Sequence, residues 1–403
     1  PGVDPGGLAK LQAQTDGGIL GLIDMFAGGA FSQASIFALG IMPYISASIV
    51  VQLLGIAVPF FQKLQKEGES GRKKMNQITR WLTVLVTLGQ APGYIVNLKS
   101  QSPEAILMDG TFFWVTSVII LTAGTLFVMW LGEKITDKGL GNGTSLIIMI
   151  GILARLPQAF GQEWAARTTR GAGGLLIMLV EIVFLIAVIM GLIMLVQGTR
   201  KVPVNYAKQI VGNRQVGGAR NFLPLKVNAA GVMPIIFAQA ILFLPTVFSG
   251  FTGEGWARHF TDHTSIIYML VYSTCVIAFT FLYTALIFNP KQMADELKRN
   301  NGFIPGVKPG QPTADYIGTI MDRITFPGAI LLAFVGILPG LIELSFSMSA
   351  NFATFFGGTS LLIMVGVILD TLQQIETQLL MRQYDGLMSS GRVQGRQAVA
   401  SGM

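Results

Sequence analysis

Charged side chains are scarce in this 403-residue chain, where Asp, Glu, Lys and Arg together make up 12% of the residues. A soluble domain carries about 25%. Hydrophobic residues make up 51%, and the mean hydropathy is +0.58. This composition excludes an ordinary soluble domain and predicts an all-α membrane protein that crosses the bilayer several times.

Cysteine and histidine are nearly absent as well. The single cysteine, Cys275, excludes a disulfide framework, and His259 and His263 share one loop with no cysteine nearby to complete a metal site. The phosphate-binding pattern G-x-x-x-x-G-K-[ST] does not occur. We therefore expect no catalytic residues, no metal and no cofactor. Any driving energy has to come from a partner or from the membrane potential.

The chain does contain long uncharged runs. Nine of them are candidate membrane spans. They cover residues 34–58, 78–96, 111–131, 145–160, 173–196, 227–248, 265–288, 327–344 and 359–380.

Most of the 28 Lys and Arg residues fall in every second loop between these runs. The positive-inside rule places those loops and the C-terminus in the cytoplasm and Pro1 outside. Two of the basic loops are long, residues 197–226 and 289–325. These loops are either docking sites for a partner or only positive charge that keeps them on the cytoplasmic side and so fixes the topology. Their length favours docking.

The stretch around which the chain is organised is residues 19–54. A short apolar segment, residues 19–25, is far too short to cross a bilayer. It leads through Gly28 and Gly29 into a full span that begins at Ala34. Irregular backbone at membrane depth is tolerated where it lines a cavity. The alternative is an interfacial or re-entrant helix with no moving role.

Two pairs of segments repeat in the same order along the chain. GIMPYI at 40–45 matches GVMPII at 231–236, and GTSLIIMIG at 143–151 matches GTSLLIMVG at 358–366. The charge-based orientation makes each pair antiparallel, which indicates inverted repeats about an axis in the membrane plane. The four matched segments should surround any pathway. The second half has five spans and the first has four, which predicts a further span before Pro1.

The matched segments are aliphatic where a solute transporter needs polar groups. Branched aliphatic side chains form a constriction that excludes water and ions. The sequence thus favours a channel for polypeptides, and a secondary transporter for a small solute is the alternative. Glu181 lies mid-span outside the repeats, either as a functional group or as a protonated or hydrogen-bonded packing residue.

Longer motifs resemble one family over essentially the whole chain. They include LGIMPYISASIVVQLL, KEGESGRKK, LGEKITDKGLGNGTS, VPVNYAK, LPLKVNAAGVMPIIFAQA, FNPKQMADELKRNNGFIPGVKPG and FGGTSLLIMVGVILDT. These resemble the SecY family, the channel subunits of the bacterial protein translocase. The resemblance implies ten helices in two inverted halves, with nine spans present here, and a channel that passes unfolded secretory chains and releases apolar helices sideways into lipid.

The resemblance also implies a division of the chain. Residues 1–33 form an external segment and plug, 34–172 the N-terminal half, 173–380 the C-terminal half and 381–403 a cytoplasmic tail. The implied partners are SecE, SecG, the SecA motor, the ribosome and its RNA, signal sequences, nascent chains and lipid. The implied location is the bacterial plasma membrane.

The resemblance also implies site residues, position by position. The pore ring falls on Ile41, Ile45, Thr144, Ile148, Ile236 and Ile363. The plug takes Ile19, Leu20, Leu22, Ile23, Met25, Phe26, Gly28 and Gly29, and the lateral gate takes Ser46, Gln52 and Gln239. Docking to the ribosome or motor falls on Arg200, Lys201, Lys208, Arg214, Arg220, Lys298, Arg299 and Lys308.

Two of these positions depart from the family pattern. Thr144 stands where an aliphatic residue is usual, and its hydroxyl is expected to bond a carbonyl of its own helix. Lys308 stands where the family usually has arginine, and lysine lacks the bidentate fork.

Overall fold

A computed structural model of the chain describes residues 2–4, 24, 27–101, 103–107, 110–139, 141–169, 172–206, 209–211, 214–216, 220–239, 242, 265–346, 348, 350–356 and 358–389. The long helices are α3 (Met42–Ala57), α5 (Glu69–Gln101), α6 (Thr111–Lys138), α7 (Gly143–Thr168), α8 (Ala172–Gln197), α11 (Ile266–Ile287), α13 (Gln311–Phe346) and α15 (Gly358–Ser389). The shorter ones are α4 (Pro59–Lys66), α12 (Pro290–Arg299), α14 (Ala350–Ala353), η2 (Pro103–Ala105) and η4 (Thr354–Phe356).

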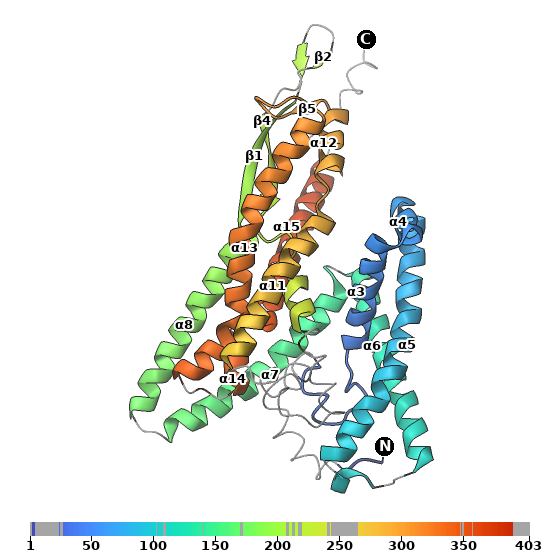
Figure 1. Ribbon diagram of the computed structural model, residues 1–403, viewed down its shortest axis with the longest axis vertical. Helices are drawn as coiled ribbons and strands as arrows, with labels where there is room; N and C mark the ends of the chain where they lie inside the picture. The colour runs from blue at the N-terminus through green and yellow to red at the C-terminus, as the bar shows by residue number, and fades with distance from the viewer. Residues whose placement is uncertain are drawn as a thin grey trace.

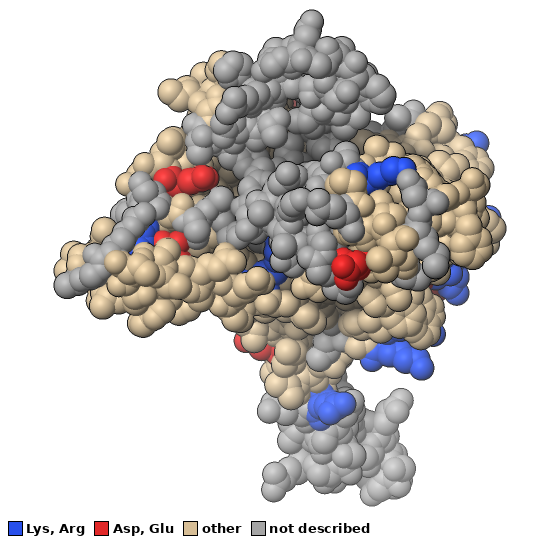
Figure 2. All heavy atoms as spheres, turned by 90° about the horizontal axis from the view of Figure 1, so that it is seen from below, with Lys and Arg blue, Asp and Glu red and all other residues tan. Residues whose placement is uncertain are grey.

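The helices form two groups (Figure 1). The N-terminal helix group, α3 to α7, lies on the right of the view, with α7 reaching across the lower part toward α8. The C-terminal helix group, α8 to α15, lies on the left. Strands β1 (Thr199–Tyr206), β4 (Arg220–Lys226) and β5 (Gly302–Phe303) and helix α12 lie at the upper end. Helix α14, the end of α7 and the start of α8 lie at the lower end. The lower end is mostly uncharged over its described surface (Figure 2).

Six of the described helices are long and apolar enough to cross a membrane, or seven if α3 and α4 count as one span bent by 99°. The bend lies at Val58, whose extended backbone (φ −110°, ψ 122°) precedes Pro59. Proline disfavours helical backbone in the residue before it, so the break follows from the sequence. Every predicted span contains helix, and the span predicted over 227–248 is described only as far as residue 239 and at Leu242.

The first predicted span begins later than expected. Residues 34–40 form turns, and α3 starts at Met42 rather than at Ala34. Gly40 has a φ of +53°, which a helix does not accommodate, and Pro43 occupies the first turn of α3, where its missing N–H is harmless.

Helix α5 covers the predicted span 78–96 but is less apolar than the others. Three of its threonines, Thr79, Thr83 and Thr87, are buried, and each hydroxyl donates to the carbonyl four residues earlier at 2.7–3.0 Å. Their hydrogen-bonding capacity is thereby used inside the helix, which lets a threonine-rich helix lie in an apolar environment.

The two helices that carry the longer sequence repeat, α7 and α15, contact each other. The backbone N–H of Gly141, just before α7, donates to the Gln374 side chain in the middle of α15 at 2.6 Å. Further along α7, Ile148 clusters with Ile363 near the start of α15. The contacts therefore move toward the start of α15 as α7 advances, so the two helices run antiparallel. This is the arrangement that an inverted repeat requires.

The two long basic loops fold into one unit. Strand β1 (Thr199–Tyr206) pairs antiparallel with β4 (Arg220–Lys226) and with β5 (Gly302–Phe303), in the order β4-β1-β5, and β2 (Gln209–Val211) pairs with β3 (Arg214–Val216). The sheet packs on α12 and the start of α13 through a small apolar core. Its buried members are Val202, Val204, Leu225, Leu297, Ile304 and Ile317. This sheet was not predicted from the sequence, because its strands are short and β1 pairs with β5 across about 100 residues.

Candidate functional site

An aliphatic cluster lies where the repeat segments meet. We call it the central cluster. Its buried core includes Ile41 at the start of α3, Ile148 on α7 and Ile363 on α15, with Ile45 of α3 packed against it. These side chains come from both helix groups and from both repeat pairs. Four of the six predicted ring residues are therefore together in one apolar contact region.

The other two predicted ring residues are placed differently. Ile236 is partly buried, and its neighbour Val232 is the residue of that segment that packs against the central cluster. The Thr144 methyl lies against Gly132 of α6, so close that a Cβ at 132 would stand 3.0 Å from it. The Thr144 hydroxyl donates to the Asn142 side chain at 2.6 Å. The bond to a carbonyl of its own helix that was predicted from the sequence is therefore replaced by a side-chain bond.

The predicted plug is described only in part. Ile19, Leu20, Leu22, Ile23, Met25 and Phe26 lie outside the described residues. Gly28 and Gly29 have φ values of +65° and +87°, in the left-handed region that glycine tolerates. A Cβ at Gly28 would stand 3.3 Å from the Cα of Gly151 on α7. The glycine turn thus packs backbone to backbone on the helix that carries Ile148.

An ion pair that was not predicted from the sequence joins the same turn to α7. The Asp24 carboxylate is fully buried and lies 2.7 Å from Nη2 of Arg155, whose side chain is 17% exposed. The Ser32 N–H donates to the other Asp24 oxygen at 2.9 Å, and the Gly29 N–H donates to the Asp24 carbonyl at 2.8 Å. An isolated acid in the apolar stretch 19–26 was the available signal, because a buried carboxylate needs a partner.

Polar contacts also link α3 to α11. The Tyr283 hydroxyl on α11 donates to Gln52 Oε1 on α3 at 3.0 Å. This bond joins the two helix groups at one of the three predicted gate residues. Phe237 stacks on Phe279 of α11 with ring centroids 5.6 Å apart, and it also lies against Tyr283.

The printed contacts of the other two predicted gate residues stay within their own helix group. Ser46 donates to the Met42 carbonyl of its own helix at 3.1 Å. Gln239 lies beside the buried side chain of Tyr272 on α11. Of the three, Gln52 is therefore the residue that hydrogen-bonds to the other helix group.

The predicted docking residues gather on the β-sheet unit at the upper end. Arg200 and Lys201 are exposed on β1, Lys298 and Arg299 are exposed at the end of α12, and Lys308 is exposed in the following turn. Two more stand on strands, Arg214 in β3 and Arg220 in β4, and Lys208 lies outside the described residues. The two loops that were predicted separately thus belong to one folded unit.

No metal centre is found among the residues that the structure describes, where no group of three or more His, Cys, Asp or Glu side chains could hold an ion. Cys275 is a free thiol on α11.

An apolar cluster at the meeting of inverted repeats, inside a bundle of membrane-length helices, defines a multi-pass membrane channel. The model of the SecY family matches residues 35–372. Protein translocase subunit SecY of Escherichia coli K12 is 41% identical over 404 residues, covering 98% of this chain and 90% of that protein. The Streptomyces scabiei subunit is 41% identical over 411 residues, covering 96% and 92%. The chain therefore belongs to the SecY family.

Solved structures agree in fold. The structure described as that of a protein conducting channel superposes with a TM-score of 0.61 at 15% identity, covering 88% of this chain and 84% of that one. Sec61 in the canine ribosome-channel complex gives 0.56 at 14%, covering 85% and 81%. The chain is a protein-conducting channel subunit and not an enzyme. Nothing in these comparisons supports the alternative of a solute transporter.

Proposed function

We propose that the central cluster is the seal of the channel. The observation that carries this proposal is the meeting of Ile41, Ile45, Ile148 and Ile363 from α3, α7 and α15. Branched aliphatic side chains keep a narrow passage dry, and a dry passage blocks ions. They hold no fixed polar group, so they can deform around a passing polypeptide. Ile236 and Thr144 remain the other two members predicted for the ring, although they are not among the residues of the central cluster.

The remaining parts of the proposal follow the division of the chain. Residues 1–33 form the external segment with the plug, 34–172 and 173–380 form the halves, and 381–403 the tail. By the positive-inside rule, the end with the β-sheet unit is proposed to face the cytoplasm of a bacterial cell, and the C-terminus is proposed to be cytoplasmic as well. The proposed partners are the ribosome, the SecA motor, and the SecE and SecG subunits.

The proposed lateral gate lies between α3 and the segment 227–239 with α11. An apolar segment of about 20 residues gains free energy by leaving the pore for lipid. The Gln52–Tyr283 hydrogen bond is one contact that has to break when the gate opens.

We expect Tyr283→Phe to ease the release of apolar segments into lipid. Losing this bond removes about 1 kcal/mol from the closed gate. Because a central leucine contributes about 0.6 kcal/mol to insertion, half-maximal insertion should need roughly one or two fewer leucines. The measurement is the inserted fraction of a series of test segments with graded leucine content.

Thr280→Val is the matched control, because the Thr280 hydroxyl donates to the Val276 carbonyl of its own helix. An unchanged leucine threshold in Tyr283→Phe would remove Gln52 and Tyr283 from the proposed gate.

Docking to ribosomal RNA is expected to depend on salt, because binding to phosphates releases counterions. Replacing both Arg200 and Lys201 by alanine should weaken ribosome binding and lower the slope of log K against log salt by about one for each phosphate that is no longer neutralised. Binding of purified ribosomes to the reconstituted channel between low and high salt measures the slope. Lys99→Ala is the control. Lys99 is exposed near the C-terminal end of α5, and its replacement should leave ribosome binding and the slope unchanged. An unchanged slope in the double variant would place the ribosome elsewhere.

A further inference from the structure

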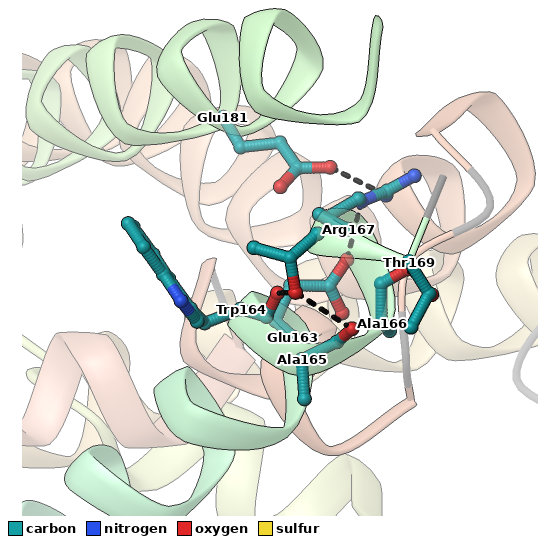
Figure 3. A network of polar contacts seen from close by, with 8 residues as sticks. Glu163, Trp164, Ala165, Ala166, Arg167, Thr169 and Glu181 are labelled. Carbon is teal, nitrogen blue, oxygen red and sulfur yellow. Dashed lines mark hydrogen bonds and ion pairs between the residues drawn. The ribbon is translucent and has the colours of Figure 1, made fainter. Parts of the chain in front are cut away.

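A buried ionic network lies at the junction of the two helix groups (Figure 3). Arg167, near the end of α7, is 1% exposed, as is Glu163 on the same helix, and Glu181 on α8 is fully buried. Nε of Arg167 lies 2.6 Å from Glu163, and Nη2 lies 2.6 Å from Glu181. One guanidinium thus holds a carboxylate from each of two helices.

Burying these charged groups in an apolar membrane span costs free energy. Glu181 lies ten residues into α8, the most apolar of the candidate spans among the described residues. A charged group at that depth is costly unless it is paired, and replacing a buried ion pair by apolar residues is often neutral or stabilising. Stability alone therefore does not account for the network, whereas fixing one arrangement of two helices does.

The network shares a helix face with the central cluster. The buried residues of α7 form one line along the helix that begins beside Thr144 and ends at the network: Ile148, Ile152, Ala159, Glu163 and Arg167. On α8, Glu181 precedes Phe184, Leu185 and Val188, which pack against the central cluster. The spacing of three, four and seven residues puts them on one face. The angle between α7 and α8 at the network therefore sets how both helices meet the cluster.

The network also lies beside the connection between the helix groups. Within the chain, α7 passes to α8 through residues 169–171 alone. Phe160 packs on Phe352 of α14, and Phe184 stacks on Phe356, so aromatic contacts flank the network on both helices. A rotation of one helix group relative to the other would therefore have its hinge at the α7–α8 connection.

We propose that Arg167 is a positioning residue that clamps α7 to α8 and so fixes the resting angle between the two helix groups. It binds no polypeptide itself. It acts through the angle at which α7 presents Ile148 to the cluster. The proposal rests on the proposed seal for its consequence, but its structural claim concerns the helix groups alone.

Two conservative variants test the clamp. Glu181→Gln keeps the size of the side chain and removes its charge. Arg167→Lys keeps the charge, but a single ammonium cannot reproduce the two nitrogens that reach two helices. In each, spin labels on exposed positions of the two groups, Val115 on α6 and Phe334 on α13, report the distance between the groups.

We expect both variants to add a displaced population, with the ratio of displaced to native arrangement rising on the order of tenfold. Glu133→Gln is the matched control. It breaks the Arg80–Glu133 pair between α5 and α6, which lies within one helix group, and should leave the distribution unchanged.

Distributions like that of the unchanged protein in both variants would overturn the clamp, and so would an equal change in Glu133→Gln. The distance readout does not depend on where the seal lies. A displaced population without any rise in resting ion conductance would therefore keep the clamp and count against the seal.

Discussion

Replacing Ile148 and Ile363 together by serine is expected to raise the ion conductance of resting channels on the order of a hundredfold. Both side chains are buried in the central cluster, one from α7 and one from α15. Losing about 1.5 kcal/mol of apolar transfer free energy at each site favours the wet state of the constriction by roughly 3 kcal/mol. Planar-bilayer recording of the purified channel measures the conductance.

The same two helices supply a matched control. Ile150 on α7 and Ile368 on α15 are 59% and 41% exposed, so serine at both should leave the conductance as it is. If the Ile148 and Ile363 double variant conducts no better than this control, the seal is not formed by the central cluster.

Breaking the Asp24–Arg155 pair is expected to release the glycine turn from α7. Arg155→Ala leaves a fully buried carboxylate without its partner, a change that costs about 3 kcal/mol or more, roughly a hundredfold in the opening of the turn. Asp24→Asn leaves a guanidinium that already reaches solvent, so we expect the smaller effect, roughly tenfold. The order of the two effects is part of the prediction.

Thiol labelling measures this opening. In a Cys275→Ser background, a cysteine at Ser32, which is 2% exposed, reacts with a membrane-impermeant reagent only when the turn opens. Arg80→Ala, which breaks a distant ion pair, is the control. Labelling of Arg155→Ala at the rate of this control would show that the pair does not hold the turn.

The sequence predicted the fold well where apolar runs and repeats carry it. Each of the nine runs contains helix, and the matched segments around Ile148 and Ile363 identified two helices that do contact each other. The predicted start of the first span, at Ala34, was wrong because the absence of charge in a run does not reveal a turn within it. Gly40 and Pro43 determine where α3 begins. The β-sheet unit was missed because its pairing joins two distant loops.

The candidate site was predictable in its aliphatic members and not in its polar partners. A ring residue can be placed from a motif, since the motif fixes its position on a helix. The polar residues that were missed bond to partners on other segments, as Arg155, Arg167 and Tyr283 do. No local sequence pattern identifies such a partner. Glu181 was left between a packing role and a functional one. Its ion pair with Arg167 across α7 and α8 gives it a partner and a place at the junction.

A translocating polypeptide is expected to pass through the central cluster, and one cross-link can detect it there. Cys275 is replaced by serine, and a cysteine is introduced at Ile363 alone. A secretory chain carrying one cysteine is stalled in the channel and oxidised. We predict a disulfide confined to the part of the chain expected at mid-membrane. A disulfide at the exposed position Ile368 instead, with none at Ile363, would contradict the claim and place the path elsewhere.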